Sequence, residues 1–149
     1  MLRKQEFRWK RFTARSLSLI SSLPCALKPL PLQTKEAVER LSLDGRRSVV
    51  LTGASTAPDL TGAMCFDVKT GRTKSVQVRR IPREFYGTGD VFASVLSGAL
   101  VRGQPLAVAV CQAVDFVRAC AERTAEQNLP IREGVDFEPL LGLLTGGHV

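Results

Sequence analysis

The fold of this chain is decided by residues 85–100, which read FYGTGDVFASVLSGAL. Two glycines flank Thr88 in a turn, and an almost entirely apolar helix, rich in small residues, follows from Gly89-Asp90 to Gly103. We expect such a helix to be buried against a sheet and neighbouring helices. The N–H groups at its start have no partner within the helix. Together with the positive end of the helix dipole they form a site for an anion such as phosphate.

The residue types in the turn suit phosphate chemistry. Gly87 and Gly89 let the backbone approach a phosphate, because no Cβ stands in the way. Asp90 is not suited to bind that phosphate, because like charges repel. A carboxylate at this place suits a base that takes the proton of a substrate hydroxyl as the hydroxyl attacks the phosphate. Taken alone, the four residues also fit an ordinary turn with an Asp in the first helical turn, so their surroundings must decide.

Helix and strand patterns alternate upstream of the turn. Residues 35–41 have the pattern of a short amphipathic helix with Thr34 as its N-cap. Residues 48–53 are β-branched and apolar on both faces, which is typical of a buried parallel strand. Thr52 and Gly53 lie at the carboxyl end of this strand, where the sheets of α/β proteins bind their ligands.

A hairpin and further helices complete the pattern. Strands over Gly62–Asp67 and Thr73–Ile81 flank a tight turn in which Gly71 supplies a positive φ. Polar residues alternate along the second strand, which indicates the edge of a sheet. A second helix follows Pro105 and continues to about Gln127, and a short closing helix lies near the C-terminus. This order of elements predicts an α/β fold.

Composition and charge limit what the chain can be. Of its 149 residues 44% are hydrophobic and 23% charged, as in ordinary globular proteins. No apolar run approaches the roughly 20 residues that cross a bilayer, so we expect no membrane partner. Residues 1–33 carry seven Lys or Arg against one acid, whereas residues 34–149 carry 14 against 13. The net charge of +7 therefore belongs to an arm, and a nearly neutral body argues against a nucleic-acid partner.

Two domains are expected from this distribution. Residues 1–33 form a basic arm that we expect to be disordered or not native to the domain, and residues 34–149 form the folded part. A basic, Ser-rich and acid-poor segment can also be a targeting peptide. A non-catalytic alternative for the whole chain is a binding module in which the arm docks on nucleic acid or another anionic surface.

The four cysteines and the single histidine, His148, predict no metal site. No C-x-x-C spacing occurs, and a structural zinc site needs four closely placed ligands. Cys111 and Cys120 are nine residues apart on one predicted helix, so they point about 180° apart and cannot pair with each other. We therefore expect reduced core cysteines, as in a cytoplasmic protein.

Residues 85–100 resemble the G-T-G-D helix of pyridoxal kinases in the ribokinase superfamily. The strand Val49–Gly53 and the tail Arg132–Phe137 are similar to that family as well, and the resemblance extends over about residues 34–144. It implies a ribokinase-like three-layer α/β/α sandwich, of which this chain would hold the C-terminal half with an incomplete sheet.

The resemblance also implies an activity. Sugar kinases of the superfamily more often carry alanine in place of Thr88, and hydroxymethylpyrimidine kinases typically carry cysteine in place of Asp90. The motif therefore favours ATP-dependent phosphorylation of the hydroxymethyl group of pyridoxal, pyridoxine or pyridoxamine. A hydroxymethylpyrimidine-type kinase of the same fold is the alternative.

Site residues follow from the same resemblance. Asp90 would be the base that deprotonates the hydroxymethyl group. The adenine would lie between the loop after residues 48–53, the region of residues 73–81 and the C-terminal helices. The anion hole for the γ-phosphate would be formed by Gly87, Thr88 and Gly89. The ATP phosphates or ribose would be bordered by Thr52 and Gly53.

The chain departs from the family in one motif. Family members carry Asn-x-x-Glu, which helps to organise Mg²⁺ around ATP, but the one asparagine here, Asn128, lies after Asp90. The family's first half, with most of the vitamer pocket, has no counterpart in residues 1–33. We therefore expect little or no vitamer phosphorylation by these residues alone. The resemblance suggests a homodimer in the cytoplasm.

Overall fold

The computed structural model describes residues 17–20, 31–128 and 130–145. Its sheet has the strand order β1-β2-β3-β4, with β1 at Leu17–Ile20, β2 at Ser48–Ala54, β3 at Leu60–Asp67 and β4 at Arg72–Arg79. β1 runs parallel to β2, whereas β3 pairs antiparallel with both β2 and β4. The buried strand predicted over residues 48–53 is therefore parallel to one neighbour and antiparallel to the other.

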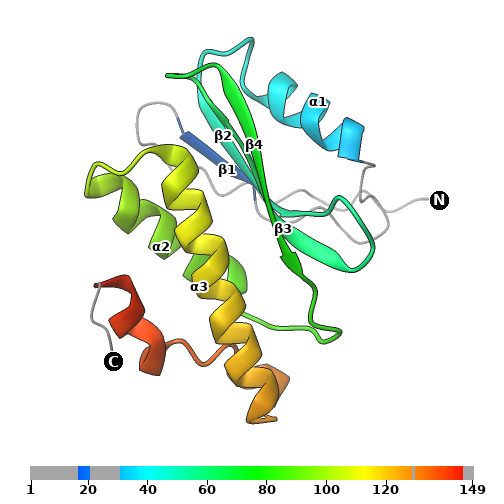
Figure 1. Cartoon of the computed structure of the whole chain (residues 1–149), viewed down its shortest axis with the longest axis vertical. Coiled ribbons are helices and arrows are strands. Elements are labelled where there is room, and N and C mark those ends of the chain that lie inside the picture. The colour runs from blue at the N-terminus through cyan, green and yellow to red at the C-terminus, as the bar shows by residue number, and fades with distance from the viewer. Residues whose placement is uncertain (1–16, 21–30, 129, 146–149) are drawn as a thin grey trace, which may run out of the picture.

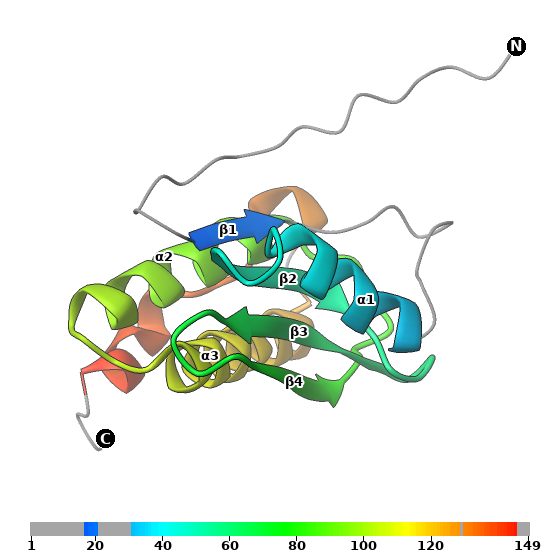
Figure 2. The ribbon, with the colours of Figure 1, turned by 90° about the horizontal axis from the view of Figure 1, so that it is seen from above.

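Helices cover both faces of this sheet. In Figures 1 and 2, α1 lies on one side of the sheet and the pair α2 and α3 on the other. The three-layer α/β/α arrangement expected from the sequence is thus confirmed. The helical elements are α1 (Pro31–Leu41), α2 (Thr88–Val101), α3 (Leu106–Glu126) and the 3₁₀ turns η2 (Ile131–Glu133) and η3 (Glu138–Leu144).

Side chains of β2 and β3 point alternately into two separate hydrophobic cores. Successive side chains of a strand point to opposite faces, so a strand that is apolar on both faces can serve both helical layers. One set packs with Val38 of α1, and it includes Val49, Leu51, Ala54 and Met64. The other set packs with α2 and α3, and it includes Val50, Ala63, Cys65, Phe92, Leu96 and Val110.

Several boundaries differ from the sequence-based expectation. α1 begins at Pro31 rather than after Thr34, because proline at the first helical position has its φ already set and lacks only an N–H that would be unpaired anyway. Within residues 1–33, Leu17–Ile20 form β1, and residues 1–16 and 21–30 lie outside the described residues. The helix α1 thus begins before residue 34, and the division of the chain into an arm and a folded part stays a prediction.

The predicted hairpin is confirmed, and β4 is the edge strand that its polar alternation indicated. Gly71 closes the turn with φ +65°, and its N–H donates to the Asp67 carbonyl at 2.8 Å. The α2 helix is less buried than expected. It buries Phe92, Val95, Leu96 and Ala99 on one side, but Val101 near its end is 88% exposed.

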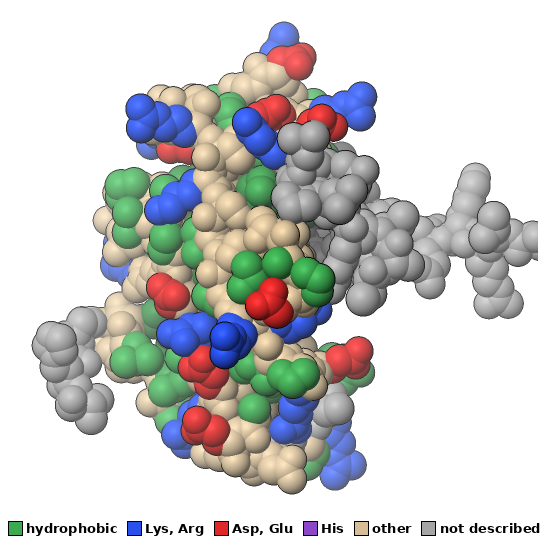
Figure 3. All heavy atoms as spheres, turned by 45° about the vertical axis from the view of Figure 1, so that its right-hand side comes forward, with side chains coloured by type: hydrophobic (Ala, Val, Ile, Leu, Met, Phe, Trp, Pro, Cys, Tyr) green, Lys and Arg blue, Asp and Glu red, His purple; other side chains and the backbone are tan. Residues whose placement is uncertain are grey.

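The described cysteines Cys65, Cys111 and Cys120 are free, as predicted for residues that do not pair, and Cys25 lies outside the described residues. Figure 3 shows acidic and basic side chains intermixed over the face that it draws, as expected for a nearly neutral body. Among the described helices, none is long and apolar enough to cross a membrane.

Candidate functional site

A cavity of about 330 Å³ opens at the edge of the sheet where β2 ends and β3 begins. Its volume falls within the range of roughly 300–1,000 Å³ that is usual for small-molecule sites. Strands, helices and the segment after β4 all contribute. The lining consists of Thr52, Gly53, Thr61, Gly62, Val78, Arg79, Arg80, Ile81, Arg83, Phe85, Thr88, Gly89, Phe92, Val114, Val117, Arg118 and Ala121.

The start of α2 forms one end of this cavity. Gly87 is the N-cap with φ 82°, a left-handed conformation that glycine adopts at little cost, and no side chain caps the helix. Its carbonyl accepts the N–H of Val91 at 3.0 Å and so closes the first turn of the helix. Thr88 and Gly89 follow directly and line the cavity. The helix N-terminus therefore presents backbone donors and its dipole to whatever occupies this end.

Apolar side chains form a wall next to this turn. Val114, Val117 and Ala121 of α3 lie at helical spacing on one face, and Phe92 of α2 and Val78 of β4 complete the wall. An apolar slot beside an anion site suits a ligand that joins a flat ring to a charged group.

Four arginines give the cavity a positive rim, and none of the described residues that line it is acidic. Arg83 lies over the ring of Phe85, 5.8 Å from its centroid, and Arg118 pairs with Glu122 at 3.0 Å. The buried Nε of Arg80 has no hydrogen-bond partner among the described residues. An unsatisfied buried donor is costly, so an anionic ligand that accepts from it would be favoured.

The structure brings four of the six predicted site residues to one cavity. Thr52 and Gly53 line it from β2, and Thr88 and Gly89 line it from α2. Gly87 lies just before them as the N-cap. Asp90 lies in the first turn of α2 with an exposed side chain, and it is not part of the lining. The roles proposed for these six residues stay predictions.

Sequence reasoning placed the C-terminal helices beside the adenine, but it did not name the residues of α3 that line the cavity, and it missed Gly62. The wall of α3 has the i, i+3, i+7 spacing of one helix face, at Val114, Val117 and Ala121, and that periodicity could have placed it. Gly62 had no local signal. A Cβ built at Gly62 would lie 1.9 Å from the Val76 carbonyl oxygen, so this glycine is set by the neighbouring strand.

The described residues do not make a magnesium site. Mg²⁺ prefers carboxylate and phosphate oxygens in octahedral geometry. No group of three or more His, Cys, Asp or Glu side chains gathers among the described residues, and the described lining of the cavity carries no carboxylate.

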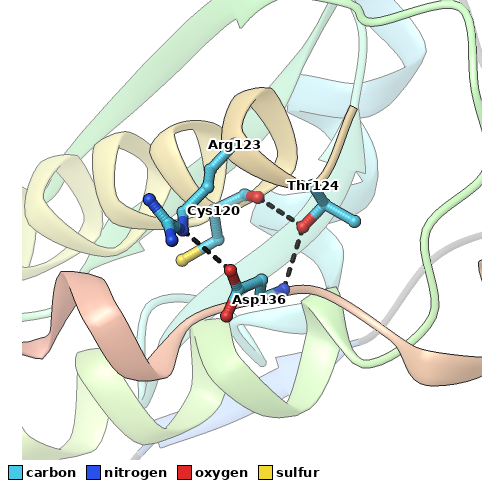
Figure 4. Close-up of polar contacts among 4 residues, drawn as sticks. All are labelled: Cys120, Arg123, Thr124 and Asp136. Carbon is cyan, nitrogen blue, oxygen red and sulfur yellow. Dashed lines mark hydrogen bonds and ion pairs between the residues drawn. The ribbon is translucent and has the colours of Figure 1, made fainter. Parts of the chain in front are cut away.

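A polar cluster next to the site joins the tail to α3 (Figure 4). The backbone N–H of Asp136 donates to Oγ1 of Thr124 at 2.9 Å, and Thr124 donates to the Cys120 carbonyl at 2.7 Å. Nε of Arg123 meets Oδ2 of Asp136 at 2.7 Å. Thr124 is only 2% exposed, so its two hydrogen bonds offset the cost of burying its hydroxyl. We call Arg123, Thr124 and Asp136 the tail clamp.

The thiol of Cys120, under the tail clamp, should make stability fall at high pH. Burial, and next the charge of Asp136, raise the pKa of Cys120 from 9.0 to about 11. The unfolded chain then releases this proton at lower pH than the folded chain, so the stabilisation is complete below pH 9 and is lost between 9 and 11. At about 1.4 kcal/mol per pH unit the loss is roughly 2–3 kcal/mol.

Urea unfolding across this pH range checks that expectation. Cys120→Ala removes the titrating group, so its free energy of unfolding should fall less steeply than that of the wild type above pH 9. Parallel curves for the two proteins would contradict the assignment to Cys120.

Comparisons with known proteins agree with this geometry. A sequence model of the phosphomethylpyrimidine kinase family matches residues 26–135. A Bacteroides thetaiotaomicron protein, provisionally assigned as a phosphomethylpyrimidine kinase and solved with pyridoxal, is 27% identical with a TM-score of 0.71, and the match covers 80% of this chain and 43% of that one. Pyridoxal kinase from Lactobacillus plantarum is 31% identical with a TM-score of 0.60, covering 66% of this chain and 35% of that one.

A more distant structure shows the fold alone. Pyridoxal kinase from Entamoeba histolytica is 19% identical with a TM-score of 0.61, and the match covers 74% of this chain and 38% of that one. A search of curated proteins finds no match. The chain thus aligns with less than half the length of each of these solved structures.

Proposed function

Because this chain belongs to the phosphomethylpyrimidine kinase family, whose fold is ribokinase-like, we propose that its cavity binds ATP for phosphoryl transfer to the hydroxymethyl group of a B6 vitamer. One observation carries the proposal. The end of β2 and the start of α2 meet in a single cavity that has an arginine rim, an apolar wall and, among the described residues, no acidic lining. The ring of adenine suits the apolar wall, and the phosphates suit the start of α2.

The proposed reaction assigns a step to each part of the turn. Asp90 takes the proton of the hydroxymethyl group as its oxygen attacks the γ-phosphorus, and the bond from that phosphorus to the β–γ bridging oxygen breaks to release ADP. Backbone N–H groups around Thr88 and Gly89 stabilise the charge on the γ-phosphate oxygens. Thr52 and Gly53 border the phosphates or ribose from the other side of the cavity.

The vitamer is the finer part of the proposal. Asp90 in place of cysteine supports a B6 vitamer, as does the pyridoxal bound to the Bacteroides neighbour. A panel of pyridoxal, pyridoxine, pyridoxamine and hydroxymethylpyrimidine, each with ATP and Mg²⁺, tests it by formation of the phosphorylated product. Product from the pyrimidine alone would overturn the vitamer assignment in favour of the alternative.

Other parts of the proposal concern the whole protein. We place the nucleotide-binding half of the domain at residues 34–149, in a cytoplasmic homodimer with ATP and Mg²⁺ as cofactors. Because the chain aligns with less than half the length of its solved relatives, direct ATP binding is the first measurement. Titration calorimetry that finds no affinity for ATP would sink the nucleotide assignment.

Gly89→Ala should abolish most ATP binding without harming the fold. A Cβ at Gly89 meets nothing within 4 Å, and its φ is not positive, so the folded chain has room for the methyl group. That same open space lies where the γ-phosphate is proposed to sit. We expect the affinity for ATP to fall at least about tenfold in calorimetry, since losing one good charge-assisted contact costs about that factor or more.

Gly142→Ala is the matched control. A Cβ at Gly142 also meets nothing within 4 Å, but this glycine lies in η3, outside the cavity lining. Its ATP affinity should equal that of the wild type. Equal ATP affinities for Gly89→Ala and Gly142→Ala would show that phosphate does not approach Gly89.

A further inference from the structure

Residues 134–136 lie between the phosphate turn and α3. In the middle of this segment the N–H of Val135 donates to the carbonyl of Tyr86, the residue just before the N-cap Gly87, at 3.1 Å. At its end the N–H of Asp136 donates to Thr124 of α3 at 2.9 Å. Consecutive residues of one segment therefore bind the approach to the turn and the helix that walls the cavity.

Close packing makes the first of these connections stiff. Gly134 has φ +76°, and a Cβ there would lie 3.3 Å from the Tyr86 carbonyl oxygen, so the two backbones are in direct contact. Val135 is 7% exposed and belongs to the core of α2 and α3. A Cβ on Gly87 would lie 3.9 Å from a methyl of Val135. Gly134 and Val135 therefore pack against Tyr86 and Gly87 and restrict the left-handed conformation of the N-cap.

The second connection is the tail clamp, and Thr124 is its central member (Figure 4). Thr124 accepts from Asp136 and donates to the Cys120 carbonyl, while Arg123 holds the Asp136 carboxylate. The amide of Gln127, with its nitrogen turned toward Asp136, would donate to the same carboxylate at 2.9 Å and accept from Arg123 at 3.0 Å. Removing the Thr124 hydroxyl would leave the Asp136 N–H without this acceptor.

We propose that Thr124 is a positioning residue for phosphate binding: through residues 134–136 it fixes the left-handed Gly87 and thereby aims the start of α2 at the cavity wall of α3. This inference rests on the proposed function for its consequence, but the mechanical link is a property of the chain itself. α3 lines the cavity at Val114, Val117, Arg118 and Ala121, so the clamp holds the phosphate end against the opposite wall.

Thr124→Val tests the link because it removes the hydroxyl and keeps the shape. The N–H of Val91 donates to the Gly87 carbonyl, and the N–H of Val135 donates to the Tyr86 carbonyl, so the exchange of these two amides reports on the turn. Losing one buried hydrogen bond should speed their exchange about tenfold, with little change at mid-α3 amides such as Ala113. Thr124→Ser, which keeps the hydroxyl, should exchange like the wild type.

Thr145→Val is the matched control, because Thr145 also donates its hydroxyl to a carbonyl, that of Gly142, but lies exposed at the end of η3. It should leave Val91 and Val135 unchanged. Unaltered exchange at Val91 in Thr124→Val would overturn the proposal. So would a uniform acceleration through α2 and α3, because it would show a general loss of stability.

ATP and adenosine titrations separate this inference from the proposed function. Thr124→Val should weaken ATP about tenfold and adenosine less than about twofold, because only the phosphate end loses its orientation. Equal weakening of both ligands would overturn the positioning role. If the wild type bound no ATP while Val91 exchange still responded to Thr124→Val, the proposed function would fail and the link between clamp and turn would stand.

Discussion

Asp90→Asn should lower whatever residual rate of ATP-dependent vitamer phosphorylation the chain supports by about 10²–10⁴-fold, the usual contribution of a positioned general base. An amide does not take the proton from the hydroxymethyl group. Asp90 lies in the first turn of α2, one residue after Gly89 at the cavity. Removing its negative charge also removes repulsion with the phosphates, so ATP should bind at least as tightly as to the wild type. A coupled kinase assay and calorimetry measure the two effects, which have opposite signs.

Asp44→Asn serves as the charge-matched control for that experiment. Asp44 is exposed in the turn after α1, and its φ of 57° is one that Asn also tolerates. It should change neither rate nor affinity. Phosphorylation by Asp90→Asn at the wild-type rate would exclude the base role. A loss of ATP affinity as large as the loss of rate would instead place Asp90 in binding.

The parts of the site that sequence could predict are those set by local chemistry. A left-handed backbone at Gly71 and Gly87 follows from a glycine between two regular elements, and both have it. The two-sided burial of β2 follows from its apolar run, since strands alternate their faces. Thr52 and Gly53 reach the cavity because the carboxyl end of a strand defines the edge where ligands bind.

What sequence could not predict depends on the approach of distant backbones. Thr124 and Asp136 are 12 residues apart, and a threonine near the end of a helix gives no sign that it holds the tail. Arg80 belongs to a basic run at the end of a strand, and only the fold turns it to the cavity. The basic composition of residues 1–33 describes their charge and not their fold, so it predicts neither β1 nor the early start of α1.

Gly62→Ala should strongly destabilise the folded chain. The new Cβ would lie 1.9 Å from the Val76 carbonyl oxygen and 3.0 Å from the Cα of Gln77, so the backbones of β3 and β4 must separate. Overpacking of this kind costs about 3 kcal/mol or more. The midpoint temperature of thermal unfolding should fall by on the order of 10 °C. Circular dichroism measures the loss of unfolding free energy in a urea titration and the thermal midpoint in a melting curve.

Gly98→Ala provides the same chemical change with the opposite expected sign. Its Cβ would meet only the flexible Arg102 side chain at 3.5 Å, and alanine in a helix interior is favoured over glycine by roughly 0.5–1 kcal/mol. Gly62 also lines the cavity, so Gly62→Ala should lose ATP binding together with its fold, whereas Gly98→Ala should keep both. A Gly62→Ala protein as stable as the wild type would refute the close pairing of β3 with β4. Without that pairing, β4 would not hold Arg79 and Arg80 at the cavity.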